Sequence, residues 1–113
     1  MKTWLAIALT AALSACMSIP PAPPAPYHAV GTEPFWNLLI DEHKLTFTQP
    51  DAAPSLQPTP KVIIGFAGEI YQTPRIKVNI VHAQCSDGMS DRVYPDKVQV
   101  RVDGKQFNGC GGL

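Results

Sequence analysis

Three cysteines carry the most definite chemistry in this sequence: Cys16, Cys85 and Cys110. Cys85 and Cys110 have no histidine at ligand spacing beside them, and two isolated cysteines make a poor zinc motif. In an oxidising compartment they would pair instead, and closing a loop of roughly 25 residues would stabilise the fold by about 3 kcal/mol. We therefore expect a Cys85–Cys110 disulfide, with a metal site as the weaker alternative. The odd third cysteine needs a separate role.

The segment after Cys85 gathers charged and hydrogen-bonding side chains: Ser86, Asp87, Ser90, Asp91 and Arg92. One interpretation is a recognition loop that presents carboxylates and a guanidinium on a base made rigid by the disulfide. The other is a structural turn at Asp87-Gly88, in which the serines cap nearby amides and Arg92 pairs with Glu33 or Asp91. The same oxygens suit calcium, but their spacing does not match an EF-hand loop and the carboxylates are too few. We expect no metal site.

The sequence predicts no catalytic site. Ser86 or Ser90 with His82 and an aspartate matches a hydrolase triad by residue type alone, without a nucleophile elbow or an oxyanion motif. The two thiols left in the domain are expected to be tied together. We therefore expect a protein that is not an enzyme and that needs no cofactor.

The elements that position these residues have the pattern of β-strands. Apolar and polar residues alternate over 44–48, 75–80 and 97–102, and no segment beyond residue 16 shows helical periodicity for more than a turn or two. Residues 35–40 and 62–66 are more continuously apolar, as expected of strands buried on both faces. The pattern predicts an all-β fold, a small antiparallel β-barrel or closed sandwich of about seven strands.

The turn at Asp103-Gly104 is the strongest short hairpin signal, because a type I′ turn needs positive φ at both central residues. A two-residue turn there pairs Val102 with Lys105 and Val100 with Phe107. The phase of the alternation places Cys85 and Cys110 together on the outward side, and it places His82 inward.

Two further segments have a predicted structural role. Four prolines between residues 50 and 60 exclude a helix or a central strand, so we expect a long surface loop there. Phe35 and Trp36 follow Pro34, and we interpret them as a buried aromatic pair, with a ligand-stacking platform as the alternative.

The N-terminus has the composition of a secretory signal. Lys2 precedes an apolar run that is too short for a permanent membrane span. Leu13-Ser14-Ala15 before Cys16 resembles the lipobox of bacterial lipoproteins, which implies cleavage after residue 15 and acylation of Cys16. We expect a lipid-anchored chain, with the lipidated cysteine and a proline-rich tether over residues 16–26 and one β domain over 27–113. Because Met17 replaces the aspartate that retains such proteins in the inner membrane, we expect an outer-membrane protein facing the periplasm.

The charge balance narrows the class of partner. Nine basic and nine acidic residues leave no basic excess, and no basic stripe is present. Nucleic acid is therefore an unlikely partner by composition. The expected partners are the membrane, through the anchor at Cys16, and an envelope protein or glycan.

Three motifs together produce a resemblance to a known family. The motifs are GTEPFW at residues 31–36, CSDGMSDR-x-YP at residues 85–95, and GCGG at residues 109–112. The chain resembles a family of small, functionally uncharacterised bacterial envelope proteins that share all three. The resemblance implies a periplasm-facing lipoprotein and implies no reaction or ligand. Some members of that family occur beside domains similar to the membrane-bound inhibitor of c-type lysozyme.

These observations favour a non-catalytic envelope lipoprotein whose disulfide-closed β domain binds a partner. The first alternative is an inhibitor of lysozyme-like muramidases that inserts the loop over 86–92 into the acidic cleft of the enzyme. Arg92 suits that cleft, whereas Asp87 and Asp91 would be repelled there. The second alternative is a purely structural lipoprotein.

Overall fold

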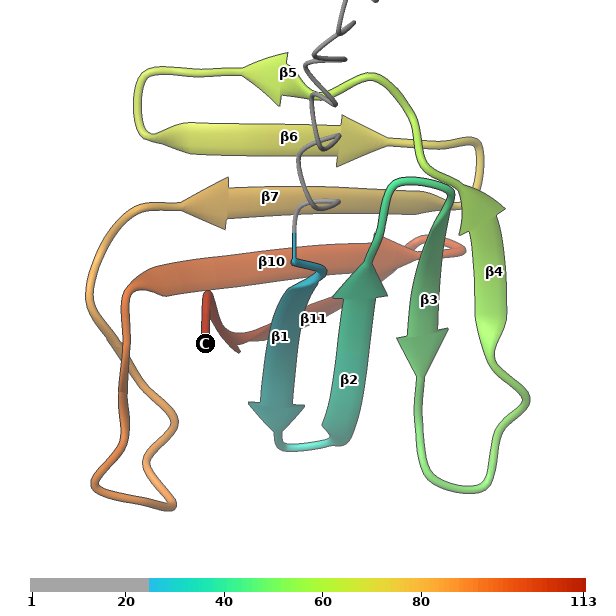
Figure 1. The fold of residues 1–113 in the computed structure, drawn as a ribbon. Coiled ribbons are helices and arrows are strands. Elements are labelled where there is room, and N and C mark those ends of the chain that lie inside the picture. The colour runs from blue at the N-terminus through green and yellow to red at the C-terminus, as the bar shows by residue number, and fades with distance from the viewer. Residues whose placement is uncertain (1–24) are drawn as a thin grey trace, which may run out of the picture.

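The computed structural model describes residues 25–113, which form eleven β-strands and no helix (Figure 1). The predictions for residues 1–15, for Cys16 and for the tether up to residue 24 lie outside the described residues. Nothing within residues 25–113 is a helix long and apolar enough to cross a membrane. The strands are Tyr27–Thr32 (β1), Phe35–Ile40 (β2), Lys44–Thr48 (β3), Ser55–Pro58 (β4), Ile63–Ile64 (β5), Gly68–Gln72 (β6), Ile76–Val81 (β7), Cys85–Ser86 (β8), Val93–Tyr94 (β9), Asp96–Val102 (β10) and Lys105–Gly111 (β11).

Nine of these strands form one antiparallel sheet in the order β4-β3-β2-β1-β11-β10-β7-β6-β5, and β8 pairs only with β9. The sheet curls into a half-barrel. Figure 1 shows β1 to β4 running steeply across the direction of β6, β7 and β10, with β11 joining the two groups. The predicted all-β antiparallel fold is confirmed. The structure has more strands than the expected seven. β5, β8 and β9 are only two residues long, which is too short for an alternation of apolar and polar residues to indicate them.

The predicted hairpin forms at Asp103-Gly104. Both residues have positive φ, 49° and 86°, as a type I′ turn requires. Val102 faces Lys105 and Val100 faces Phe107 across β10 and β11, in the predicted register.

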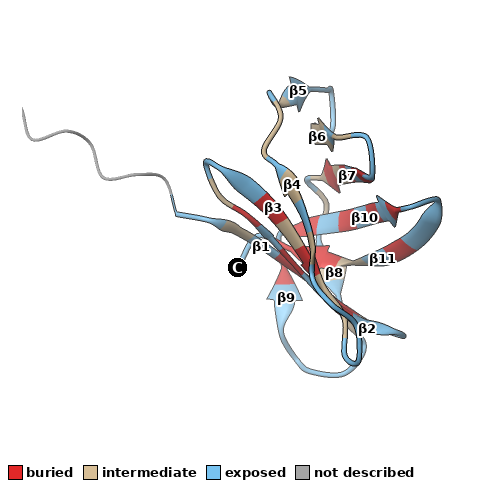
Figure 2. Ribbon diagram, turned by 90° about the vertical axis from the view of Figure 1, so that its right-hand side faces the viewer, coloured by how far each residue is buried: buried red, intermediate tan, exposed pale blue. Residues whose placement is uncertain are grey.

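The core occupies the inner side of the curl. Alternate residues of β2, β3, β7 and β10 are buried there, and Figure 2 shows this as bands of red along these strands. Trp36, Phe47 and Phe107 pack in series, with ring centroids 5.8 Å and 4.9 Å apart. Trp36 is only 1% exposed, so its predicted burial is confirmed.

Two expectations of full burial are wrong. β2 alternates instead of being buried on both faces, so that Phe35 and Leu39 remain 55% and 38% exposed. Residues 62–66 contain only the short edge strand β5, and Ile63 and Ile64 are exposed. The reason is that the domain has one curled layer, and no second sheet covers the outer face at these positions.

The proline-rich segment over 50–60 is not a loop throughout. Residues 55–58 form β4, which pairs with β3 alone and lies at the edge of the sheet. An edge strand tolerates Pro58 because the missing N–H would face outward, away from the ladder. The prediction that this segment is neither a helix nor a central strand is confirmed.

Candidate functional site

A disulfide joins Cys85 in β8 to Cys110 in β11, with the Cα atoms 5.6 Å apart. The predicted pairing is confirmed. Cys110 lies opposite Lys97 in β10 and Val30 in β1, so it points to the outer face of the sheet, the side away from the core. Cys110 is nevertheless only 1% exposed. The disulfide therefore holds the segment that follows β8 against the outer face of β1, β10 and β11.

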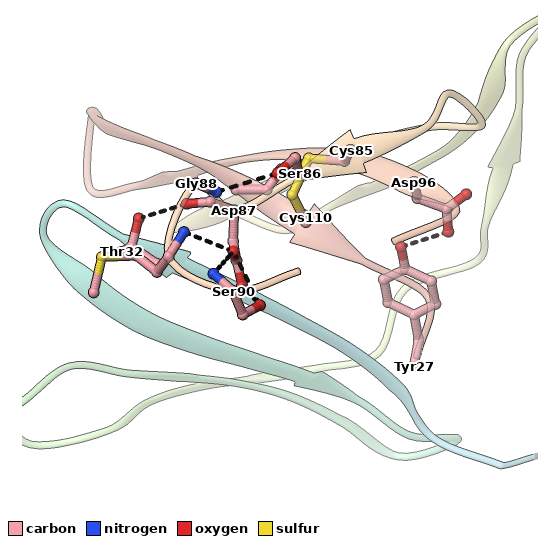
Figure 3. Close-up of a disulfide and its surroundings, with 11 residues drawn as sticks. Tyr27, Thr32, Cys85, Ser86, Asp87, Gly88, Ser90, Asp96 and Cys110 are labelled. Atoms are coloured by element: carbon pink, nitrogen blue, oxygen red, sulfur yellow. Dashed lines mark hydrogen bonds between the residues drawn. A yellow bond between two sulfur atoms is a disulfide. The ribbon is translucent and has the colours of Figure 1, made fainter. Parts of the chain in front are cut away.

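The loop between β8 and β9 is closed by its own hydrogen bonds, as Figure 3 shows. The amides of Met89 and Ser90 each donate to Oδ1 of Asp87 at 2.9 Å, and Oγ of Ser90 donates to Oδ2 of Asp87 at 3.1 Å. Gly88 has a φ of 73°, and its amide donates to Oγ of Ser86 at 3.4 Å. The bonds from the two amides are the main reason why the pKa of Asp87 lies below its usual value.

The loop also touches the first hairpin of the domain. Oγ1 of Thr32, the last residue of β1, donates to the carbonyl oxygen of Asp87 at 3.5 Å (Figure 3). The GTEPFW and CSDGMSDR motifs, more than fifty residues apart in sequence, therefore meet at one place on the outer face.

A hollow of about 330 Å³ lies between the loop and the outer face of β1, β10 and β11. Half of its lining residues carry polar side chains, namely Thr32, Ser86, Asp87, Lys97, Gln99 and Asn108, and the others include Val30, Val98 and the disulfide. Gln99 and Asn108 face each other across β10 and β11. Donors and acceptors on a rigid sheet, with one ammonium and one carboxylate, can bind a hydroxyl-rich or charged group.

The predicted loop residues fall into two sets. Ser86, Asp87 and Ser90 are brought together and are engaged in closing the turn, as the structural interpretation requires. Asp91 and Arg92 are exposed. Within residues 25–113, Arg92 forms no salt bridge with Glu33 or Asp91, so that part of the interpretation is wrong. The Asp87 carboxylate closes the turn instead, because it accepts hydrogen bonds from the backbone amides of Met89 and Ser90.

A second polar cluster was not predicted. Asp96 is only 5% exposed; Oη of Tyr27 donates to its Oδ2 at 2.8 Å, and Nδ1 of His82 lies 2.6 Å from its Oδ1. Nε2 of His82 lies 2.9 Å from a carboxylate oxygen of Glu69. One feature of the sequence indicates this cluster, namely the alternation along β10. It places Asp96 on the core side with Val98, and a buried carboxylate needs hydrogen-bond partners.

This cluster raises the pKa of two side chains, His82 and Tyr27. The hydrogen bonds to Asp96 and then to Glu69 raise the pKa of His82. Burial, followed by the bond to Asp96, raises the pKa of Tyr27 well above its usual value. His82 lies on the core side with Asp96, as its phase predicts, but its side chain is 54% exposed, so it is not an interior residue. Both ring nitrogens face carboxylates, and neither Ser86 nor Ser90 is a partner of the ring.

The glycines of the GCGG motif serve close packing. A Cβ on Gly109 would lie 2.0 Å from the carbonyl oxygen of Val30 and 2.6 Å from Cζ2 of Trp36. A Cβ on Gly111 would lie 2.5 Å from Oη of Tyr27. The motif thus allows β11 to pass close to β1, beside the disulfide.

Residues 25–113 contain no group of three or more histidine, cysteine, aspartate or glutamate side chains placed to hold a metal ion. No protein-family model, curated protein or solved structure matches the chain. The resemblance drawn from the three motifs therefore stays a prediction.

Proposed function

We propose that this protein is a non-catalytic envelope lipoprotein, anchored through an acylated Cys16 in the outer membrane, and that its disulfide-fixed loop and the polar hollow beneath it bind an envelope protein or glycan. The observation that carries the proposal is the placement of the loop. The Cys85–Cys110 disulfide holds it across the outer face of the sheet, where it forms one wall of a hollow of about 330 Å³ that is lined by both polar and apolar side chains. Binding sites are commonly built in this way, with a few polar groups held on a rigid base.

The groups available to a partner differ from those that build the loop. Asp87, Ser86 and Ser90 are engaged within the turn, so their loss would change its shape. Asp91 and Arg92 are exposed further along the loop, and Gln99 and Asn108 line the hollow. We expect the two exposed charges of the loop to select the partner, and the side chains that line the hollow to bind it by hydrogen bonds.

The test is affinity capture from whole envelopes, with captured partners identified by mass spectrometry. The lipidated protein is the bait, beside a variant that carries Asp91→Ala and Arg92→Ala. A matched control carries Glu42→Ala and Lys44→Ala, which removes the same charges from the exposed turn between β2 and β3. A partner that is captured by the parent and by the control, but not by the variant with Asp91→Ala and Arg92→Ala, supports the proposal.

Two other outcomes would contradict it. Equal backgrounds with all three baits would favour the purely structural lipoprotein. Turnover of a substrate by the purified protein that ends with Ser86→Ala or Ser90→Ala would replace the binding role with an enzymatic one. Mass spectrometry of the purified chain tests the anchor separately, because acylation adds a defined mass at Cys16.

A second function has one observation in its favour. Arg92 is exposed and makes no salt bridge within the described part of the chain, so its guanidinium is available for the carboxylates of a muramidase cleft. The adjacent Asp91 opposes that use. Muramidase activity that falls at saturating protein, and recovers with Arg92→Ala, would support the inhibitor; unchanged activity would exclude it.

A further inference from the structure

The hairpin of β5 and β6 exposes a cluster of large apolar side chains. Ile63 and Ile64 are 50% and 72% exposed, and Phe66, in the turn between the strands, is fully exposed. β5 is also the last strand of the sheet on its side. Scattered apolar residues are ordinary on a protein surface. Three large apolar side chains within four consecutive residues of one hairpin indicate instead a contact with another apolar surface or with lipid.

The hairpin begins where the N-terminal segment joins the domain. Ala25 and Tyr27 line one hollow, of about 300 Å³, together with Val62 and Tyr71, which belong to the start of the hairpin region and to β6. Cys16 precedes Ala25 by nine residues. A chain of that length spans at most about 30 Å even when fully extended. An acyl group on Cys16 would therefore keep Ala25, and with it the start of the hairpin region, within about 30 Å of the lipid.

The hairpin and the candidate binding loop lie at opposite ends of the domain. In Figures 1 and 2, β5 is at the top and the loop next to β9 is at the bottom. A surface that contacts the hairpin would leave the polar hollow directed away from it. Such an arrangement suits a protein that is fixed at one end and binds at the other.

We propose that the β5–β6 hairpin docks on the membrane to which Cys16 is attached, with Ile63, Ile64 and Phe66 inserted at the boundary between headgroups and acyl chains. This inference rests on the lipid anchor of the proposed function. Aromatic and aliphatic side chains favour this boundary, and the exposed Lys61 beside the hairpin suits anionic headgroups. The hairpin sets the orientation of the domain, whereas the acyl chains supply the affinity.

The experiment places an indole at the tip of the hairpin. Acylated protein carrying Phe66→Trp is reconstituted in vesicles of phosphatidylethanolamine and phosphatidylglycerol, with or without brominated acyl chains. The matched control is Phe35→Trp, because Phe35 is 55% exposed and lies at the start of β2, at the other end of the molecule. Trp36 is only 1% exposed and contributes the same background to both variants.

We expect the brominated chains to quench the indole fluorescence of Phe66→Trp at least roughly threefold more than that of Phe35→Trp. Acrylamide, which quenches from the water, should quench Phe35→Trp more than Phe66→Trp. Equal quenching of the two indoles by brominated lipid would overturn the docking while leaving the anchor intact. Protection from both quenchers would also overturn it, because a second copy or the N-terminal segment would then cover the hairpin. A mass spectrum without acylation at Cys16 would overturn the proposed function and this inference together.

Discussion

Gly109→Ala should open the junction between β1 and β11. The added Cβ would lie 2.0 Å from the Val30 carbonyl oxygen, whereas an ordinary contact begins near 3.4 Å, so the strands must separate by about 1.4 Å. The carbonyl oxygen belongs to the backbone and cannot rotate away. The new Cβ cannot shift toward the core either, because it would already lie 2.6 Å from Cζ2 of Trp36. Overpacking of this kind costs roughly 1–3 kcal/mol, and the rigid neighbours place this case near 3.

The assay is urea unfolding of the oxidised protein, followed by circular dichroism. A loss of about 3 kcal/mol is a large share of the 5–15 kcal/mol typical of a domain, and it would lower the melting temperature by about 12–24 °C. The control is Gly65→Ala, where the nearest atom to the new Cβ is the Gly68 carbonyl oxygen at 3.6 Å. If Gly109→Ala stayed within about 0.5 kcal/mol of the control, β1 and β11 could not pack as closely as described.

Three other predictions concern the disulfide, the polar cluster and the loop. Replacing Cys85 and Cys110 together with alanine should destabilise the domain by about 3.5 kcal/mol in urea unfolding, and an unchanged midpoint would contradict the stapling role. The raised pKa of His82 means that its stabilising effect is complete below the unfolded value of 6.5 and disappears as the pH rises through the higher folded value. The free energy of unfolding of the parent minus that of His82→Gln should therefore shrink across that window, and a difference that is the same at all pH values would contradict this role. Asp87→Ala should speed amide hydrogen exchange in its own loop and leave the exchange of β10 unchanged; faster exchange over the whole sheet would contradict a purely local role.

Much of the central sheet was predictable because local patterns decide it. β10 and its turn follow from strict alternation and from the Asp103-Gly104 pair, and both the register and the positive φ values agree. The disulfide followed from the cysteine count and from the shared phase of the two residues. These features depend on side-chain period and on turn geometry, which a sequence states directly.

The remaining features depend on long-range placement. Continuous apolar runs at 35–40 and 62–66 suggested double burial, but a single curled layer leaves one face of each strand open. The contact of Thr32 with the loop and the pairing of Tyr27 with Asp96 join residues 55 and 69 positions apart. No local pattern shows which distant segments a sheet of this order brings together.

The place of β11 has a consequence for how the chain can be assembled. Among the described strands β11 comes last in sequence, yet in the nine-stranded sheet it lies between β1 and β10 and pairs with both, so that it joins β1 to β4 with β5, β6, β7 and β10. Until residues 105–111 are available, each group is a separate meander that lacks the other half of the core. High sequence separation of this kind makes folding late and concerted. A chain that emerges during synthesis would thus lack the strand that joins the two groups until residues 105–111 had been made.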